Sequence, residues 1–146
     1  MSFARRLYDS RSDVIAAVAH GAGTVEQLHA PVVGPVSFGD GRIDYPYVQV
    51  LPDSTTQQSG NDWQHTVRLN CIFQRTRDDD HLRFLDVTFD AVAAALAELE
   101  TIDCVYSYVP TTIEDFAGED DGNLLVMISV EIQVGALVDL ADDGDA

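Results

Sequence analysis

Two stretches of the chain place apolar residues at the spacing of an amphipathic helix. Residues 3–20 carry apolar side chains on one face, and Gly21 and Gly23 then favour a helix end. Residues 78–99 repeat the spacing more strongly, with apolar positions three or four apart: Leu82, Leu85, Phe89, Val92, Leu96 and Leu99. The acidic residues at 78–80 suit the positive end of a helix dipole. The pattern therefore predicts two helices.

Elsewhere apolar and polar residues alternate one by one, as in a half-buried strand. The longest alternation runs from Trp63 to Gln74, and its mainly apolar face consists of Trp63, His65, Val67, Leu69, Cys71 and Phe73. Strand-like segments also cover residues 47–51, 102–109 and 124–134. Alternation of this kind is typical of antiparallel sheets that cover a core on one side.

The segments between these elements read as connections. Residues 24–46 are rich in glycine and proline, with a short hairpin predicted around Asp40-Gly41. Residues 53–61 form a polar stretch without an apolar anchor, and residues 111–123 an acidic, glycine-containing one. We interpret both as exposed loops. Residues 139–146 have the composition of a disordered acidic tail, which leaves residues 1–138 as a single domain.

The order of elements is helix, strands, helix, strands. This order predicts an α+β fold, in which a mainly antiparallel β-sheet carries the two amphipathic helices on one face. A length of 146 residues suits one domain with a core of its own. Since no apolar run reaches about 18 residues, we expect no membrane partner.

Charge changes the picture more than any other compositional feature. The chain has 25 acidic residues against 8 basic ones, all arginine, and a net charge of -17. At molar salt the Debye length falls to about 3 Å, so self-repulsion is screened and an acidic surface stays hydrated. We interpret the composition as that of a protein from a halophilic cytoplasm. A genome that favours arginine codons would explain the missing lysine but not the excess of aspartate. Non-specific binding of DNA through a basic surface is excluded by the same balance.

Motifs for catalysis or cofactor binding are absent from the sequence. The chain has no GxSxG elbow, no phosphate-binding glycine loop and no HExxH pair. We read His65 as a partly buried, hydrogen-bonded imidazole and Cys71 and Cys104 as buried free thiols. The acidic runs at 78–80 and 119–121 have a composition suited to binding a divalent cation. A helix start at 78–80 and a solvated loop at 119–121 explain them as well. We therefore expect neither an enzyme nor a cofactor.

Arginines are the more informative charged residues in so acidic a chain. Arg68, Arg75 and Arg77 lie on or just after the longest predicted strand, and Arg42 lies in the preceding loop. The planar guanidinium forms bidentate ion pairs with carboxylates, often across interfaces. Two interpretations stay open: ion pairs between subunits, or pairs within one chain that contribute little at high salt.

An ordered set of short motifs runs through the chain. Asp40-Gly41-Arg42 precedes the strand Tyr45-Pro46-Tyr47-Val48-Gln49-Val50, and Asp62-Trp63-Gln64 opens the next strand. Tyr106-Ser107-Tyr108 then precedes an acidic stretch, and the last strand ends in Ile132-Gln133-Val134. In this order the motifs resemble the tail terminator family of siphoviruses, over roughly residues 3–134.

The resemblance implies a non-enzymatic virion protein, assembled in the host cytoplasm, that forms a ring. It implies a homo-oligomer, a hexamer, that caps the head-proximal end of the tail tube and stops its polymerisation. The implied partners are the tail tube protein and the head–tail connector or stopper, with DNA passing through the lumen without specific binding. Besides the four arginines, we expect the interface to include Thr55, Gln57, Gln58, Glu119 and Asp120.

Two alternatives remain. One is another neck protein, such as a head–tail stopper or a tail-completion protein, which shares the small α+β or β-rich design. The other is a small-molecule-binding or enzymatic α+β domain of a haloarchaeon, which needs a pocket with convergent polar groups and a titratable residue of shifted pKa.

Overall fold

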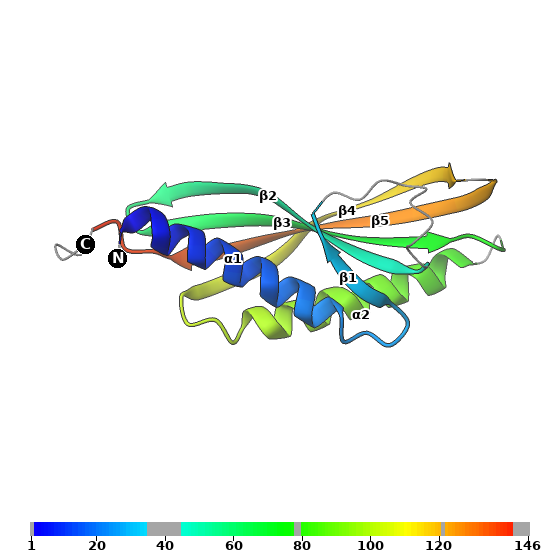
Figure 1. Cartoon of the computed structure of the whole chain (residues 1–146), viewed down its shortest axis with the longest axis horizontal. Coiled ribbons are helices and arrows are strands. Elements are labelled where there is room, and N and C mark those ends of the chain that lie inside the picture. Colours follow the sequence, from blue (N-terminus) through cyan, green and yellow to red (C-terminus); the bar gives the residue numbers. More distant parts are fainter. Residues whose placement is uncertain (1, 35–44, 78–79, 121, 142–146) are drawn as a thin grey trace.

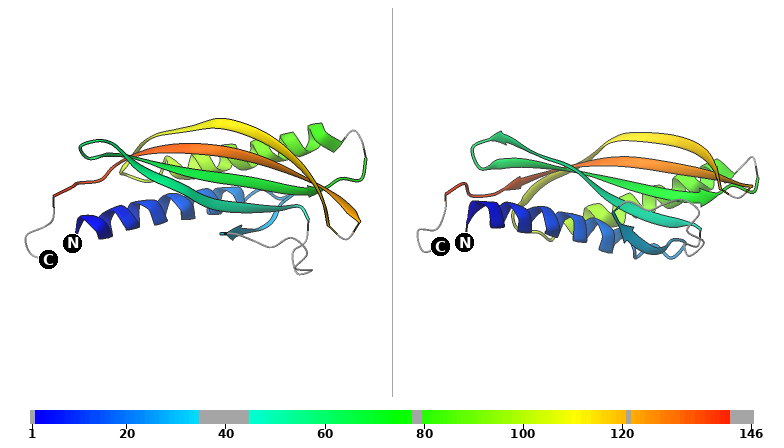
Figure 2. Two further views of the ribbon diagram at one scale, coloured as in Figure 1. Left: turned by 90° about the horizontal axis from the view of Figure 1, so that it is seen from above. Right: turned by 45° about the horizontal axis from the view of Figure 1, so that its top comes forward.

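The computed structural model describes residues 2–34, 45–77, 80–120 and 122–141 (Figure 1). The elements in chain order are α1 (Phe3–Ala22), β1 (His29–Val33), β2 (Tyr47–Ser59), β3 (Asp62–Gln74), α2 (Asp80–Leu99), β4 (Val105–Asp120) and β5 (Asn123–Leu137). The strands form one sheet in the order β1-β2-β3-β5-β4. Only β1 and β2 pair in parallel. Both helices lie against the same face, as Figures 1 and 2 show. The predicted α+β fold is confirmed.

The core lies between the helices and the centre of the sheet. On β3 and β5 the alternating apolar side chains point toward the helices, and those of Leu69, Ile128, Val130 and Ile132 are fully buried. The apolar face predicted for β3 is buried from His65 to Phe73, but Thr66, Asn70 and Ile72 on the opposite face are buried too, so the strand is more than half-buried. A sheet covered on one side by two helices is the two-layer solution for elements with one apolar face each.

The two helices pack on each other through a glycine. A Cβ atom built on Gly21 would lie 2.7 Å from Cα of Ala95, so the backbone of α1 touches that of α2. At the start of α1, Oγ of Ser2 accepts a hydrogen bond from the backbone N–H of Arg5 at 3.2 Å. Gly21, predicted only as a helix stop, also sets the distance between the helices.

Two predicted loops are wrong, because both are strands. The polar stretch 53–61 belongs largely to β2, which runs to Ser59 and pairs with β3 up to a turn at Gly60 and Asn61. The stretch 111–123 belongs largely to β4, which pairs with β5 as far as Asp120. Both segments lie at sheet edges and are exposed, so they lack the apolar face from which strands are recognised. Gly60 and Gly122, at φ 53° and 82°, form the two turns.

The region predicted as loop between α1 and β2 contains one strand. β1 pairs with the first part of β2, from Tyr47 to Val50. It is only five residues long, contains Pro31 and shows no alternation, which explains why the apolar pattern missed it. The hairpin predicted around Asp40-Gly41 lies outside the described residues.

The chain after β5 folds back onto the domain. The backbone N–H of Val138 donates to the carbonyl of Asn61 at 2.8 Å, and that of Leu140 donates to Oδ1 of Asn61 at 2.9 Å. Nη2 of Arg6 donates to the carbonyl of Asp139 at 3.0 Å. The first residues of the predicted tail, 139–141, are thus bonded to the domain, and residues 142–146 lie outside the described residues. None of the helices in the described part of the chain has the length and apolarity to span a membrane.

Candidate assembly surfaces

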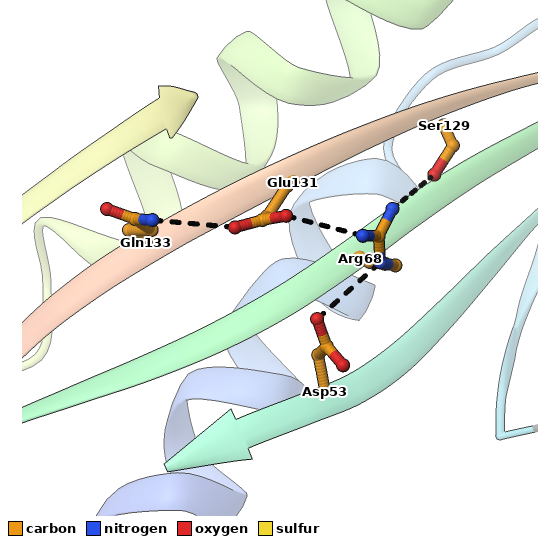
Figure 3. A network of polar contacts seen from close by, with 5 residues as sticks. All are labelled: Asp53, Arg68, Ser129, Glu131 and Gln133. Carbon is orange, nitrogen blue, oxygen red and sulfur yellow. Dashed lines mark hydrogen bonds and ion pairs between the residues drawn. The ribbon is translucent and has the colours of Figure 1, made fainter. Parts of the chain in front are cut away.

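Arg68 lies at the centre of the sheet face that the helices leave open (Figure 3). Its Nη2 is 3.3 Å from Oε2 of Glu131 on β5, and its Nε is 3.5 Å from Oδ2 of Asp53 on β2. Nη1 donates to Oγ of Ser129 at 3.5 Å. One guanidinium therefore bridges three strands. The side chains of Arg68 and Asp53 are 33% and 45% exposed, so water screens their attraction and the pair contributes little to stability.

Amides extend this polar network along the same face. Nε2 of Gln133 donates to Glu131 at 3.4 Å, as Figure 3 shows. Nδ2 of Asn70 donates to Oε1 of Gln49 at 3.2 Å, and both side chains are buried. Oδ1 of Asn70 has no hydrogen-bond partner among the described residues. The polar positions of β3 thus bond to neighbouring strands in two separate groups, one around Arg68 and one at Asn70.

The three predicted arginines that the structure describes, Arg68, Arg75 and Arg77, have different partners. Arg68 pairs with carboxylates of its own chain, in line with the second of the two interpretations left open above. Arg75 and Arg77 follow the end of β3, where Nε of Arg75 donates to the carbonyl of Arg77 at 3.4 Å. Arg42 lies outside the described residues. An inter-subunit role for these side chains stays a prediction.

The other predicted interface residues lie at two opposite ends of the molecule. Thr55, Gln57 and Gln58 are on the distal half of β2, beside the β2–β3 turn. Glu119 and Asp120 end β4 at the β4–β5 turn, which Figure 1 places at the far end of the sheet. Glu119 is exposed, and only the backbone of Asp120 is described. Thr55 has a role within the chain, because its Oγ1 is 2.9 Å from Nδ1 of His65.

His65 is buried between two hydroxyl groups. Its Nε2 is 2.9 Å from Oγ of Ser10 on α1, while Nδ1 faces Thr55. A neutral imidazole has one donor and one acceptor nitrogen, so one hydroxyl accepts from the ring and the other donates to it. Burial, together with the positive charge of Arg11, lowers the pKa of His65 to about 4. The predicted hydrogen bonding of His65 is confirmed, and the ring is fully rather than partly buried.

Sequence reasoning missed Ser10 as part of this cluster. Ser10 lies on the buried side of α1, four residues before Val14, so the helical spacing carried the signal. Its Oγ is also 3.7 Å from Sγ of Cys104. Both cysteines are free, as predicted, but only Cys71 is buried, whereas Cys104 is partly exposed. Burial raises the pKa of the Cys71 thiol to about 12.

Two hollows flank the sheet near the β4–β5 turn. One, of about 480 Å³, lies between α2 and the end of β3, with Tyr45, Phe73 and Phe84 beside the charged Arg83 and Asp86. The other, of about 230 Å³, is lined by Ile72, Phe116, Leu125 and Met127 among others. The first hollow has the volume of a small-molecule site. Among the described residues, no group of three or more His, Cys, Asp or Glu side chains is arranged to hold a metal ion.

Strand β4 carries a row of exposed apolar side chains along the sheet edge, with Val109 on the open face opposite Gln133 and Ile113 on the helix side opposite Val130. Tyr106, Val109, Ile113 and Phe116 are each between 46% and 54% exposed. The ring of Tyr106 lies against Gly135 of β5, where a Cβ atom would come within 2.8 Å of its Cζ. The Tyr106 hydroxyl donates to Oδ1 of Asp62 on β3, and this hydrogen bond raises the pKa of the tyrosine. The sheet therefore presents an apolar and aromatic margin on its β4 side.

No family model matches the chain, and no curated protein matches it. Among solved structures, it is similar to a chain of the virion of a native gene transfer agent (GTA) particle. The TM-score is 0.44 and the identity 13%, over 87% of this chain and 93% of that chain. Likeness at this level carries no argument about function.

Proposed function

We propose that the chain is a structural virion protein that forms a ring on the head-proximal end of a viral tail tube. The observation that carries this proposal is the exposed apolar row of β4, a long strand at the edge of the sheet. Long, exposed apolar edges are templates for association, and monomeric proteins avoid them. A subunit of a ring buries such an edge against its neighbour.

The ordered motifs of the sequence support the assignment to the tail terminator class. Tyr47-Val48-Gln49-Val50 opens β2, and Asp62-Trp63-Gln64 opens β3. Tyr106-Ser107-Tyr108 lies at the start of β4, and its acidic stretch follows in the same strand. Their spacing thus corresponds to the strand starts of one sheet. A head–tail stopper or tail-completion protein is the nearest alternative, because it would need the same kind of exposed edge.

In this proposal the ring is a hexamer whose partners are the tail tube protein and the head–tail connector. DNA passes through its lumen without specific contacts, because an acidic wall repels phosphate. The net charge of -17 fits assembly in a halophilic, archaeal cytoplasm, since molar salt screens the repulsion between subunits.

Size-exclusion chromatography with light scattering at molar salt tests the ring. The 15.9 kDa chain should elute as one species of six times that mass. A polymerisation assay tests the terminator role. Added to assembling tail tube protein, the ring should shorten the tubes and appear at one end of each in electron micrographs. Rings that leave tube length unchanged and instead bind the isolated connector would favour the stopper. A monomer would contradict both.

The 480 Å³ hollow favours a second candidate function, the binding of a small molecule. Its aromatic wall, with Arg83 and Asp86 beside it, suits a ligand with a flat apolar part and polar substituents. A thermal-shift screen of nucleosides and aromatic acids tests this candidate. A ligand that raises the melting temperature of the wild type but not of Phe84→Ala would support it.

A further inference from the structure

Charge is distributed unevenly along the edges of the sheet. The second half of β4 carries Glu114, Asp115, Glu119 and Asp120, but residues 104–113 contain no charged residue. The distal half of β2 resembles the latter, because residues 54–61 are also uncharged and nearly all exposed. Charged side chains are a common device by which proteins keep sheet edges from pairing. In a chain with 25 acidic residues, this device is missing from two edge segments.

The two uncharged segments lie at the same level of the sheet, on opposite sides. Partners in the pairing register connect them row by row across the central strands: Ser54, Thr66, Gln133 and Val109; Thr55, His65, Val134 and Tyr108; Thr56, Gln64, Gly135 and Ser107. Among the described strands, β1 pairs only with the first part of β2, so the outer side of Ser54–Ser59 has no neighbour. In the described part of the chain, the outer side of β4 has no neighbouring strand either.

The charges next to the uncharged β2 segment are occupied within the chain. Asp53, which precedes this segment, pairs with Arg68 at 3.5 Å. Asp62, which follows the turn, accepts the hydroxyl of Tyr106. The charges next to the β4 segment, Asp103 and Glu114, lie outside it, so an edge that approaches either segment meets backbone groups, hydroxyls, amides and apolar side chains.

We infer that the uncharged segment of β4 in one copy adds to the uncharged segment of β2 in the next copy, an assignment that rests on the proposed ring. Strands β2 and β4 run antiparallel to each other, because the three pairings between them are all antiparallel. A rotation about an axis along the strands keeps their directions, so the contact continues the antiparallel order of the sheet. The contact uses two different surfaces, so it is heterologous and repeats from copy to copy until the ring closes.

The charge distribution favours a second copy of this chain as the partner of the two uncharged segments. Each copy has a net charge of -17, so a contact between copies is least unfavourable where both surfaces are uncharged. Regular pairing spans Ser54–Gln57 on one side and Ser107–Pro110 on the other, because register shifts interrupt the ladders outside these residues. The contact is therefore short in backbone terms, and Tyr106 and Val109 add apolar area to it.

Two charge substitutions test the inference, one on each edge. Thr56→Glu places a carboxylate on the β2 segment, and Val109→Glu places one on the β4 segment. Leu82→Glu is the matched control, because Leu82 is 73% exposed on α2 and lies on neither edge. Masses are measured by light scattering at molar salt, and circular dichroism with thermal melting checks that each variant is folded. We expect each edge variant alone to be monomeric and the control to assemble like the wild type.

Mixing the two edge variants separates this inference from other contacts. Each variant keeps one intact edge, so a 1:1 mixture should yield two-subunit complexes and nothing larger. Edge variants that form wild-type rings would overturn the assignment and leave the ring itself standing. An assembly lost in Val109→Glu but kept in Thr56→Glu would overturn it in favour of a symmetric β4–β4 contact. A monomeric wild type would overturn both the inference and the proposed function.

Discussion

Protonation of His65 should destabilise the fold between pH 6.5 and 4. The imidazole is 1% exposed and has both nitrogens within 2.9 Å of hydroxyls, and its pKa falls from 6.5 to about 4. The unfolded chain therefore binds a proton in this range that the folded chain does not. Since the folded pKa is depressed, the folded state keeps its full stability above pH 6.5 and loses it as the pH falls.

The size of the loss follows from the two pKa values. One pKa unit corresponds to about 1.4 kcal/mol, so complete titration would cost about 3 kcal/mol. Between pH 7.5 and 5 the linkage relation gives a loss of about 2 kcal/mol, with a slope near 1.2 kcal/mol per pH unit at pH 5. This is a large fraction of the roughly 5–15 kcal/mol that keeps a domain folded.

The assay is urea unfolding at molar salt, at pH 7.5, 6.5, 5.5 and 5.0. His65→Gln is the reference variant, because it removes the titrating group while its amide can still bond to Ser10 and Thr55. The free energy of unfolding of the wild type, minus that of the variant, should fall by about 2 kcal/mol across the series. An NMR titration of the wild type reads the same group directly and does not depend on the variant folding. A difference that stays constant with pH, or an imidazole of His65 that titrates near 6.5, would refute the reasoning.

Further predictions concern close packing, thiol access and salt. Gly21→Ala forces a methyl group into the backbone of α2 and should cost about 1–3 kcal/mol in urea unfolding, whereas Ala16→Ser, on an exposed position of α1, should cost less than about 1 kcal/mol. Gly135→Ala should displace Oγ of Ser107 and the ring of Tyr106 and should cost less than Gly21→Ala, because these are side-chain ends that can move, whereas Gly21 meets backbone. In the native protein a thiol reagent should modify Cys104 rapidly and the fully buried Cys71 only after unfolding. Dialysis from molar to about 0.1 M salt lengthens the Debye length to about 10 Å and should lower the melting temperature, whereas an unchanged value would count against the halophilic interpretation.

The apolar pattern predicted those elements that have one side buried in the core. β3 was expected at 63–74 and spans Asp62–Gln74, and α2 was expected at 78–99 and spans Asp80–Leu99. Each has one side in the core, so the spacing of its apolar residues follows from which side chains are packed there. The open sheet face was also predictable in kind, because the alternation in β3 placed Arg68 and Asn70 opposite the apolar side chains. Their partners on β2 and β5 were not, since strand register depends on turns that the pattern did not locate.

The elements that escaped prediction lie at the sheet edges. In the distal half of β2 only Thr55 is partly buried, and Ser, Thr and Gln side chains occupy both faces. In the second half of β4 acidic residues replace the apolar alternation. Ser10 was missed for a different reason, because a hydroxyl on a buried helix face is recognised only once its partner His65 has been placed beside it. Long-range contacts of this kind leave no local signature.

The distal half of β2 nevertheless carries information of another sort. A solvated surface of this chain would be expected to hold acidic residues, since they outnumber basic ones by 25 to 8. A core strand would hold apolar ones. Ser54–Ser59 has neither, although it is a regular strand with one side unpaired among the described strands. A strand that is neither buried nor charged in so acidic a chain fits a surface that becomes buried only in the assembly, where a neighbour's backbone completes its hydrogen bonds. Because this strand has no apolar pattern, it could not be predicted from the sequence. The proposed contact requires the same property.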